Sequence, residues 1–434
     1  MFLLCLVKNI CRWGGIMIKN EIKRETYLEK LEEFKDTDFV KVFLGIRRSG
    51  KTSLLHSWID ELKNMGIPSE NIIFISLESS QYNSVESSEE LNKIVFDKAK
   101  NIEGKLYLFF DEIQQVNQWE KSINGYRVDF DCDIYISGSN SNLLSGELAT
   151  HLGGRYILIN VYPFSFKEVL KYKHEIEGLE LSEESINSLF EDYYVNYGGM
   201  PSILPLKKDD SIKSALIDIY NSILLKDVLS RYKINNIDLL KRYSQYMMNS
   251  IGQTYSSTKI KNYLKSNNVY TTQNTLLKYN EYLQQSYFIS KCSRYDFKGK
   301  KILKIYEKYY LTDHGFHHAL IENNSAWITM TIENIVYIEL LRRGYAVNVG
   351  KLDYGDKTKE SQEIDFVCEK SGKYVYIQVS YLLSSEQTIE REFAPFFRIP
   401  DKYETYVISA DRFDLSQKGV KHLNIIDFLV GDEI

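Results

Sequence analysis

Residues 42–55 read VFLGIRRSGKTSLL, an apolar run that breaks at Gly45, passes two arginines and resumes as a leucine-bearing segment behind Gly-Lys-Thr. Residues 45–52 fit the pattern G-x-x-x-x-G-K-[ST]. FVKVFL in front of the pattern is typical of a buried strand, and TSLLHSWIDELKNM behind it carries apolar residues at helical spacing. The sequence therefore predicts a loop that joins the end of a strand to the start of a helix.

A loop of this kind is suited to bind a polyphosphate. The amino end of a helix presents unpaired backbone N–H groups and a partial positive charge, which together bind anions. Lys51 would reach the β- and γ-phosphates, and the Thr52 hydroxyl would complete the coordination of Mg²⁺. The residues predicted to bind the nucleotide are Gly45, Arg48, Ser49, Gly50, Lys51, Thr52 and Ser53.

A second predicted strand ends in two acids. LYLFFDEIQQV is apolar from Leu106 to Phe110 and then supplies Asp111 and Glu112. A strand that ends in two acids is also common as an ordinary exit into a turn, but downstream of a phosphate loop it indicates a catalytic pair. We expect Asp111 to bind Mg²⁺ through water and Glu112 to polarise the attacking water.

A third predicted strand, Cys132 to Ile136, delivers Ser137, Ser139 and Asn140 at its end. Their polar side chains would contact the γ-phosphate or position the water. The segment lacks the N-K-x-D pattern that reads guanine, so we predict ATP as the nucleotide. Arg155 follows a pair of glycines and would stabilise phosphoryl charge in cis or from a neighbouring subunit, or else be a solvated or structurally paired arginine.

At this point the residues resemble a known family. The segments GIRRSGKTSLL, FFDEIQ, SGSNSNLLSGELATHLGGRY, PFSF and YGGMPS resemble the prokaryotic AAA+-superfamily ATPases that pair an AAA domain with a C-terminal domain of unknown function. KDVLSRYKI, KYYLTDHGF, ENIVYIELLRRGY and EIDFV resemble the rest of that family in the same order. The roles that the resemblance implies are Gly45, Lys51 and Thr52 in the nucleotide loop, Asp111 and Glu112 as the acidic pair, Asn140 as the sensor and Arg155 as a candidate arginine finger.

Length and composition predict a globular protein of two to four domains, with 434 residues, 44% of them hydrophobic and 26% charged. The apolar run before Met17 is too short for a signal peptide or a membrane span, so we interpret residues 1–16 as a non-native start extension. We expect a cytoplasmic protein with no membrane segment. The five cysteines form no C-x-x-C pair, so no zinc site is predicted.

Residues 166–245 are predicted to form a helical lid over the nucleotide. Two apolar-periodic stretches, the first entered at Ser182, flank the segment YGGMPS. Its glycines, Gly198 and Gly199, would be a hinge, a close backbone approach or an ordinary turn between helices. We interpret Asp227 and Arg231, one helical turn apart, as a solvated pair.

Residues 255–310 are strongly basic, with eleven Lys or Arg against three Asp or Glu, whereas the whole chain has a net charge of -5. Two predicted helices and a hairpin that turns at Lys298-Gly299 indicate a winged-helix domain over residues 246–320. Thr271 or Thr272 would cap the second helix. Residues 272–278 would face a DNA groove and residues 298–301 its backbone. The alternative is a winged helix that contacts protein.

The last part of the chain, residues 321–434, predicts a helix followed by strands. It resembles the restriction-endonuclease-like core, whose metal-dependent pattern is E, D, then [EQ]-x-K. The matching positions are Glu333 or Glu339, Asp365, Gln378 and Ser380. Because Ser380 stands where that pattern has its lysine, we predict a degenerate site in an interaction module, although Asp365 and Gln378 would still be able to hold a metal or bind DNA.

The predicted fold class is α/β: a P-loop NTPase (AAA+-like) domain at 17–165, the helical lid at 166–245, the winged helix at 246–320 and the restriction-endonuclease-like domain at 321–434. The predicted function is ATP binding and hydrolysis, with ATP and Mg²⁺, in a protein whose nucleotide state controls a DNA-binding C-terminal half. Two alternatives stay open: a regulatory ATPase that binds protein partners, and an ATP-gated DNA nuclease. A homo-oligomer is also left open.

Overall fold

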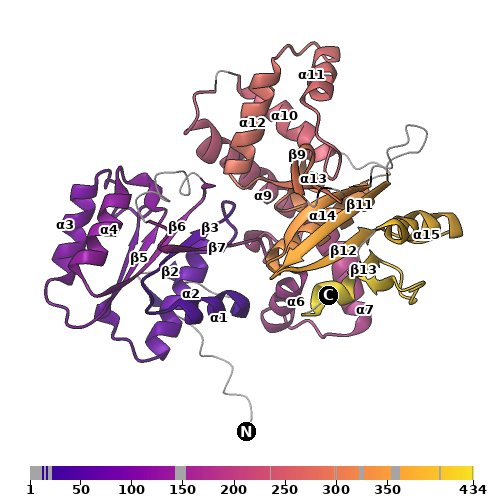
Figure 1. Cartoon of the computed structure of the whole chain (residues 1–434). Coiled ribbons are helices and arrows are strands. Elements are labelled where there is room, and N and C mark those ends of the chain that lie inside the picture. Colours follow the sequence, from indigo (N-terminus) through magenta and orange to yellow (C-terminus); the bar gives the residue numbers. More distant parts are fainter. Residues whose placement is uncertain are drawn as a thin grey trace, which may run out of the picture.

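The computed structural model of the protein describes residues 12–13, 16–17, 22–141, 153–234, 236–297, 299, 301–321, 327–352, 362–399, 402–432 and 434 (Figure 1). Two large sheets organise these residues, one of five strands and one of seven. A further pair of short strands, β1 (Arg12–Trp13) and β2 (Ile16–Met17), lies near the amino terminus.

The five-stranded sheet is entirely parallel, in the order β4-β5-β6-β3-β7. Every residue of β3 and of β5 is buried. Helices cover both faces of a parallel sheet, which explains why these strands are continuous apolar runs in the sequence. The bounds are β3 (Val40–Leu44), β4 (Ile72–Ser76), β5 (Leu106–Asp111), β6 (Cys132–Gly138) and β7 (Tyr156–Asn160).

This sheet has a core on each face, because successive strand residues point to opposite sides. Phe110 packs in the core that contains residues of α3 (Ser88–Ala99) and α4 (Trp119–Asp129). Phe109 packs in the opposite core, with α1 (Glu25–Phe34) and α2 (Lys51–Asn64). Figure 1 shows the two helix pairs on either side of the sheet. The carboxyl ends of all five strands therefore meet at one edge, where the segments after β3, β5 and β6 come together.

The lid, residues 166–245, is helical as predicted. Ser165 and Ser182 each form a capping box at a helix start. Its elements are α6 (Phe166–Glu175), α7 (Glu183–Ser188), η4 (Leu189–Tyr194), α8 (Val195–Tyr197), η5 (Pro201–Ile203), α9 (Asp209–Ser222), the π-helical η6 (Ile223–Leu229) and most of α10 (Ile237–Asn249).

Two further helices and a hairpin follow, also as predicted. They are α11 (Ser257–Ser266), α12 (Gln273–Gln285), β8 (Ile289–Asp296) and β9 (Lys301–Leu311). The hydroxyl of Thr272 caps α12 by accepting the backbone N–H of Thr275 at 3.1 Å. Lys298 and Lys300 of the predicted turn lie outside the described residues.

The seven-stranded sheet has the order β14-β13-β12-β11-β10-β8-β9. β10, β11 and β12 form an antiparallel meander, and β13 and β14 continue it in parallel. Its remaining strands and helices are α13 (Gly315–Leu320), α14 (Trp327–Arg342), β10 (Ala346–Leu352), β11 (Gln362–Lys370), β12 (Lys373–Val379), α15 (Glu386–Phe393), η7 (Ala394–Arg398), β13 (Glu404–Ser409), β14 (Lys421–Asn424) and α16 (Ile425–Val430).

The hairpin β8–β9 belongs to this sheet, because β8 pairs in parallel with β10, with Asn348 opposite Ser293. The boundary that we predicted at residue 320 therefore falls between strands of one continuous sheet. The pairing buries Cys292 and Tyr295 of β8. A free wing would leave such side chains in water, and their burial explains why the hairpin joins the C-terminal strands.

One hydrophobic core runs through the lid and the C-terminal half, residues 246–434. It contains Leu216 and Ile223 of the lid, Leu276 of α12, and Ile332 and Phe366 near the carboxyl end. The cores of the five-stranded sheet are separate clusters. The lid therefore packs as part of the C-terminal half, and the same core takes in Ile22, Ile46 and Phe164 from the ATPase domain.

The segment YGGMPS is a close backbone approach. Phe164 donates its backbone N–H to the carbonyl of Gly199 at 2.7 Å. A Cβ at Gly199 would lie 1.9 Å from the carbonyl oxygen of Phe164, so only glycine fits there. No helix in the described part of the chain combines the length and apolar character needed to cross a lipid bilayer.

Candidate functional site

The predicted phosphate loop leaves β3 at Leu44 and enters α2 at Lys51. Gly45 is required by packing, since a Cβ there would lie 2.2 Å from the carbonyl oxygen of Val161. The loop borders a cavity of about 630 Å³. Of the predicted nucleotide-binding residues, those that line the cavity are Arg48, Gly50, Lys51, Thr52 and Ser53. The other two of these residues, Gly45 and Ser49, are buried and do not line this cavity.

Lys51 is held inside the loop. Its ammonium donates to the carbonyl oxygens of Gly45 at 3.0 Å and Ile46 at 3.2 Å. Burial lowers the pKa of Lys51 in spite of the nearby carboxylates of Glu112 and Asp111. An anion that enters the cavity would therefore meet a poorly solvated ammonium, for which a phosphate oxygen is a strong partner.

Thr52 and Asp111, the two predicted Mg²⁺ residues, lie side by side. The Thr52 hydroxyl is 3.2 and 3.1 Å from the two carboxylate oxygens of Asp111. Ser76 and Ser137 also donate to this carboxylate. In the described part of the chain no group of three or more His, Cys, Asp or Glu is placed to hold a metal. A hydroxyl and a single carboxylate fit Mg²⁺, which usually keeps its waters and shares the ligands of a bound phosphate.

Glu112 has a left-handed backbone, with φ of 54°, which is uncommon outside glycine and occurs at functional sites. Its backbone N–H donates to Ser137 Oγ at 3.0 Å, and its carboxylate accepts from Ser139 Oγ at 3.2 Å and from Gln114. Burial would raise the pKa of Glu112, but the positive charges of Lys51 and Arg47 outweigh it and lower the pKa.

The pKa values of the two neighbouring acids are thus shifted in opposite directions. Burial, together with the charge of Glu112, raises the pKa of Asp111, whereas the pKa of Glu112 is lowered. Such a separation is typical of carboxylates that take different roles in one site. Glu112 lines the cavity, and its lowered pKa favours the ionised form that a general base needs.

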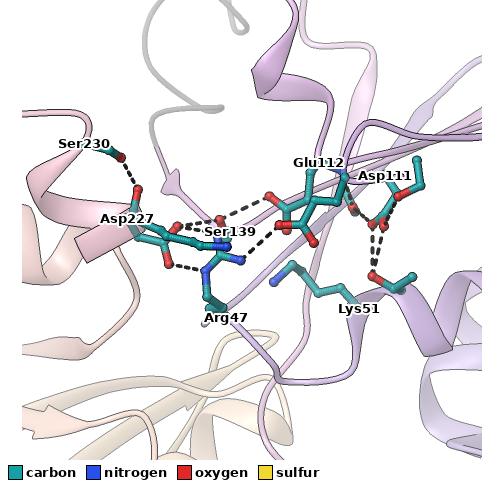
Figure 2. Close-up of polar contacts among 12 residues, drawn as sticks. Arg47, Lys51, Asp111, Glu112, Ser139, Asp227 and Ser230 are labelled. Atoms are coloured by element: carbon teal, nitrogen blue, oxygen red, sulfur yellow. Dashed lines mark hydrogen bonds and ion pairs between the residues drawn. The ribbon is translucent and has the colours of Figure 1, made fainter. Parts of the chain in front are cut away.

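A residue of the lid completes this arrangement (Figure 2). Asp227 on η6 is fully buried and accepts two hydrogen bonds from Arg47 of the phosphate loop, from Nε at 2.9 Å and from a terminal nitrogen at 3.0 Å. Ser139 Oγ donates to the same carboxylate at 3.0 Å. Figure 2 shows Asp227 facing Arg47 and Ser139 from the side opposite Glu112.

Our interpretation of Asp227 as half of a solvated pair was wrong. Arg231 is 3.7 Å away, but the principal partner of Asp227 is Arg47. The missed signal was periodicity: Asp227 continues the buried face of Ile223 and Leu224. A carboxylate on the apolar face of a helix needs a buried partner, and no pattern in the sequence identified that partner.

The other two predicted catalytic residues have different outcomes. Asn140 is fully buried just after β6, at the same edge as Asp111. Arg155 lies at the opposite edge, where its carbonyl accepts the N–H of Val40 and its exposed side chain is 3.8 Å from Asp38. The structure thus does not bring Arg155 together with Lys51, Asp111 and Glu112, and its action from a neighbouring subunit stays a prediction.

The predicted C-terminal site is partly assembled. Glu333 of α14 and Asp365 of β11 meet around Lys308 of β9, whose ammonium is 3.3 Å from Glu333 Oε1 and 3.9 Å from Asp365 Oδ1. Lys308 also pairs with Glu363. The alternative acid, Glu339, lies apart from this group and pairs with Arg342 and Arg343. Of the two acids that we considered on α14, only Glu333 joins the cluster.

The remaining two predicted residues border the cluster. The Gln378 side-chain oxygen accepts the backbone N–H of Asp365 at 3.2 Å, and its amide donates to Glu392 at 2.9 Å. Ser380 Oγ makes a bond of 3.4 Å to the carbonyl of Leu382. The cation beside these acids is therefore Lys308 of β9. The charge count had assigned Lys308 to a basic surface, but it is buried.

The rest of the predicted basic segment has an exposed part on α11 and α12. Between Tyr255 and Asn280 the sequence contains no Asp or Glu. The exposed side chains there include Lys259, Lys261, Lys265 and Lys278, with the apolar Tyr263, Tyr270 and Leu277 among them.

A five-stranded parallel sheet, a phosphate loop between β3 and α2 and an acidic pair at the end of β5 define an AAA-type P-loop ATPase domain. In agreement, residues 37–170 match the AAA_14 family, described as an AAA domain, and residues 188–326 match a domain of unknown function, DUF8612. An uncharacterized protein of Haemophilus influenzae is 38% identical over 416 residues, which cover 95% of this chain and 100% of that protein. The chain belongs to the family of this protein.

A second relative, the uncharacterized protein MJ1544 of Methanocaldococcus jannaschii, is 32% identical over 407 residues, or 88% of this chain and 87% of that protein. Among solved structures, the Walker-type ATPase PABY2304 of Pyrococcus abyssi has a TM-score of 0.47 at 17% identity, covering 69% of this chain and 96% of its own. The ORC1 protein of Aeropyrum pernix in complex with DNA has a TM-score of 0.32 at 11% identity, covering 70% and 93%.

Proposed function

We propose that the protein binds and hydrolyses ATP and that its nucleotide state controls a DNA-binding C-terminal half. The observation that carries the ATPase proposal is the convergence of Lys51, Thr52, Asp111 and Glu112 at one edge of the parallel sheet. Lys51 and Arg48 would hold the phosphates, and Glu112 would take the proton of the attacking water.

The lining of the cavity combines two kinds of side chain. Lys51, Thr52 and Glu112 are polar or charged, and Ile22, Phe164, Tyr172, Pro201 and Pro205 are apolar or aromatic residues suited to the flat face of adenine. Mg²⁺, when bound, would neutralise phosphate charge, and Thr52 and Asp111 are the residues that would hold it. Several lining residues come from the lid, so nucleotide binding would draw the lid and the sheet together.

ATP turnover with Lys51→Ala as the blank tests the first part. We expect the wild-type protein to release phosphate in a Mg²⁺-dependent reaction that Lys51→Ala loses. Addition of duplex DNA tests the second part. Turnover stimulated by DNA supports the coupling, whereas ATP turnover indifferent to DNA would leave the ATPase proposal standing and redirect the C-terminal half to a protein partner.

The exposed face of α11 and α12 supports DNA as the partner. It combines four lysines with exposed aromatic and apolar side chains, and Glu281 is the single acid on the two helices, which suits a phosphate backbone. In this proposal residues 246–320 act as a winged helix whose α12 faces the groove, with Gln273, Asn274 and Lys278 near its amino end exposed.

A triple charge reversal tests the surface directly. The combined variant Lys261→Glu, Lys265→Glu and Lys278→Glu should weaken duplex DNA binding at least about tenfold. The slope of the logarithm of the binding constant against the logarithm of the salt concentration should fall by an amount that corresponds to roughly three phosphate contacts. Lys93→Glu, an exposed position on α3, is the matched control and should bind as the wild type does. Equal binding by the triple variant would remove the DNA proposal.

For residues 321–434 we propose a restriction-endonuclease-like fold that binds without cutting. The motivating observation is that the ammonium of Lys308 already occupies the space between Glu333, Glu363 and Asp365. We expect no nicking of plasmid DNA with Mg²⁺ or Mn²⁺. Nicking that disappears in Asp365→Ala would instead establish the nuclease alternative.

A further inference from the structure

We infer that Asp227 is a positioning residue for ATP hydrolysis: by holding Arg47 away from Glu112, it makes the availability of the base depend on the position of the lid. This inference rests on the proposed ATPase function. It concerns a residue of the lid that touches neither the phosphates nor the water, and that acts through Arg47 and Ser139.

The contact between Asp227 and Arg47 fixes the guanidinium at two points. Nε bonds Oδ2 at 2.9 Å and a terminal nitrogen bonds Oδ1 at 3.0 Å, the planar fork that gives the best geometry for this pair. The third corner of the guanidinium reaches Glu78 at 3.2 Å. Arg47 therefore uses all sides of its fork while Asp227 is in place.

Arg47 and Glu112 line the same cavities, together with Glu78. An arginine that lost its buried carboxylate partner would keep its charge and seek another acceptor, because a guanidinium cannot lose its proton in a protein. Glu112 is a buried carboxylate within this group. A released Arg47 would pair with it and remove the free electron pair that the base needs.

Ser139 supplies a second link between the same groups. Its hydroxyl is 3.0 Å from Asp227 Oδ1 and 3.2 Å from Glu112 Oε2. A hydroxyl carries one proton, so it donates to one of these carboxylates at a time. Asp227 competes for that proton and so draws the donor away from the Glu112 oxygen. Loss of Asp227 would turn the proton fully to Glu112.

The contact joins the ATPase domain to the lid. Arg47, Glu112 and Ser139 follow the carboxyl ends of β3, β5 and β6, whereas η6 is anchored by Ile223 and Val228 in the core shared by the lid and the C-terminal half. Any movement of the lid therefore reaches the base through the Asp227 carboxylate.

The same helix is connected to α12. Tyr232, just beyond η6, stacks on Tyr282 of α12 with ring centroids 3.8 Å apart and an interplanar angle of 9°, and its hydroxyl donates to Gln285. A displacement of α12 by a ligand would be passed to η6 and so to Asp227. The coupling proposed above has a physical route in this chain of contacts.

Asp227→Asn tests the inference, since it keeps the size of the side chain and removes its charge. We expect turnover at saturating MgATP to fall at least about tenfold, while the dissociation constant of a fluorescent ATP analogue changes by less than about threefold. Asp238→Asn is the matched control, because Asp238 also pairs with an arginine, Arg242 at 2.7 Å, but on the surface of α10. It should leave both quantities unchanged.

A double variant separates positioning from a structural role. If released Arg47 occupies Glu112, then Arg47→Met in the Asp227→Asn background should restore turnover by at least about threefold over Asp227→Asn alone. A structural role predicts that the double variant is no faster. Wild-type turnover in Asp227→Asn, or a double variant as slow as the single one, would overturn the inference.

Asp227→Ser keeps the test available if Asp227→Asn does not fold, because it also removes the charge that holds Arg47. It should lower turnover with unchanged affinity for the ATP analogue, and full turnover in Asp227→Ser would count against the inference. The failure of the proposed function has a different signature, namely wild-type turnover no higher than that of Lys51→Ala. If the wild type hydrolyses ATP and the variants do so at the same rate, only the role of Asp227 is refuted and the ATPase proposal stands.

Discussion

Lys308 of β9 and Glu333 of α14 form an ion pair in which Nζ lies 3.3 Å from Oε1. Lys308 is buried, and the pair connects the hairpin β8–β9 to α14. Glu363 and Asp365 share the same ammonium, and the hydroxyl of Tyr310 donates to Glu333 at 2.6 Å. Burial would lower the pKa of Lys308, but the three carboxylates outweigh it and raise the pKa. The ammonium thus stays charged and offsets the repulsion among the acids.

Lys308→Met should therefore lower the free energy of unfolding by about 3–5 kcal/mol, because it leaves buried carboxylates without a cation. Urea unfolding measures this change. Lys291→Met, which removes a more exposed lysine paired with Glu307 on the same sheet, should cost less than about 1 kcal/mol. Glu333→Gln in the Lys308→Met background should recover part of the loss, and equal midpoints for the two lysine variants would contradict this account.

The sequence predicted what is local in the chain. Gly45 to Thr52 form one loop, so spacing alone placed Lys51 and Thr52, and the end of an apolar run placed Asp111 and Glu112. The parallel sheet then follows, because strands that alternate with helices have few other arrangements. The caps at Ser182 and Thr272 were predictable for the same reason, since capping depends only on neighbouring residues.

What could not be predicted depends on partners far apart in the chain. Arg47 and Asp227 are separated by 180 residues, and no local pattern says that a helix carboxylate meets a phosphate-loop arginine. Lys308 was counted as surface charge because composition does not distinguish an inward lysine from an outward one. The addition of β8 to β10 likewise depends on side chains from both strands being buried together.

Gly45→Ala should lower the free energy of unfolding by about 1–3 kcal/mol and abolish binding of the ATP analogue, because the added Cβ would strike the carbonyl oxygen of Val161. Gly125→Ala within α4 is the matched control, since its Cβ would meet Asp129 at an ordinary 3.8 Å. Alanine is the better helix former, so this variant should gain about 0.5–1 kcal/mol. Urea unfolding should show a lower free energy of unfolding for Gly45→Ala and a higher one for Gly125→Ala. A lower value for both variants would indicate that the contact with Val161 is not the cause.

Glu112→Gln should bind the ATP analogue and yet release phosphate roughly 10²–10⁴ times more slowly, since it removes the base but keeps the size of the side chain. Single-turnover phosphate release and equilibrium binding, measured on the same preparation, check both halves. Glu103→Gln, an exposed acid in front of β5, should match the wild type. Hydrolysis at the wild-type rate in Glu112→Gln would transfer the role of base to another group.

Stability should fall on acidification between about pH 6.5 and pH 4 because two histidines are buried uncharged. Burial lowers the pKa of His314 and of His317 to about 4 each, and the two ring nitrogens of His317 have no hydrogen-bond partner among the described residues. In this window the unfolded chain binds two protons on these imidazoles that the folded chain does not, so the free energy of unfolding decreases as the pH falls.

Asp313 opposes this trend with a single proton. Burial raises the pKa of Asp313 to about 6, although the backbone N–H groups of Gly199 and Gly315 act to lower it. Below pH 6 the folded chain therefore binds a proton at Asp313, whereas the unfolded chain binds it only near pH 4. Two histidines against one aspartate leave a net loss of about 3–4 kcal/mol in the free energy of unfolding by pH 4. Urea unfolding at pH 7, 5.5 and 4.5 measures it. His317→Gln should flatten the slope, His174→Gln on the exposed side of α6 should not, and equal slopes for His317→Gln and the wild type would exclude His317 as a source.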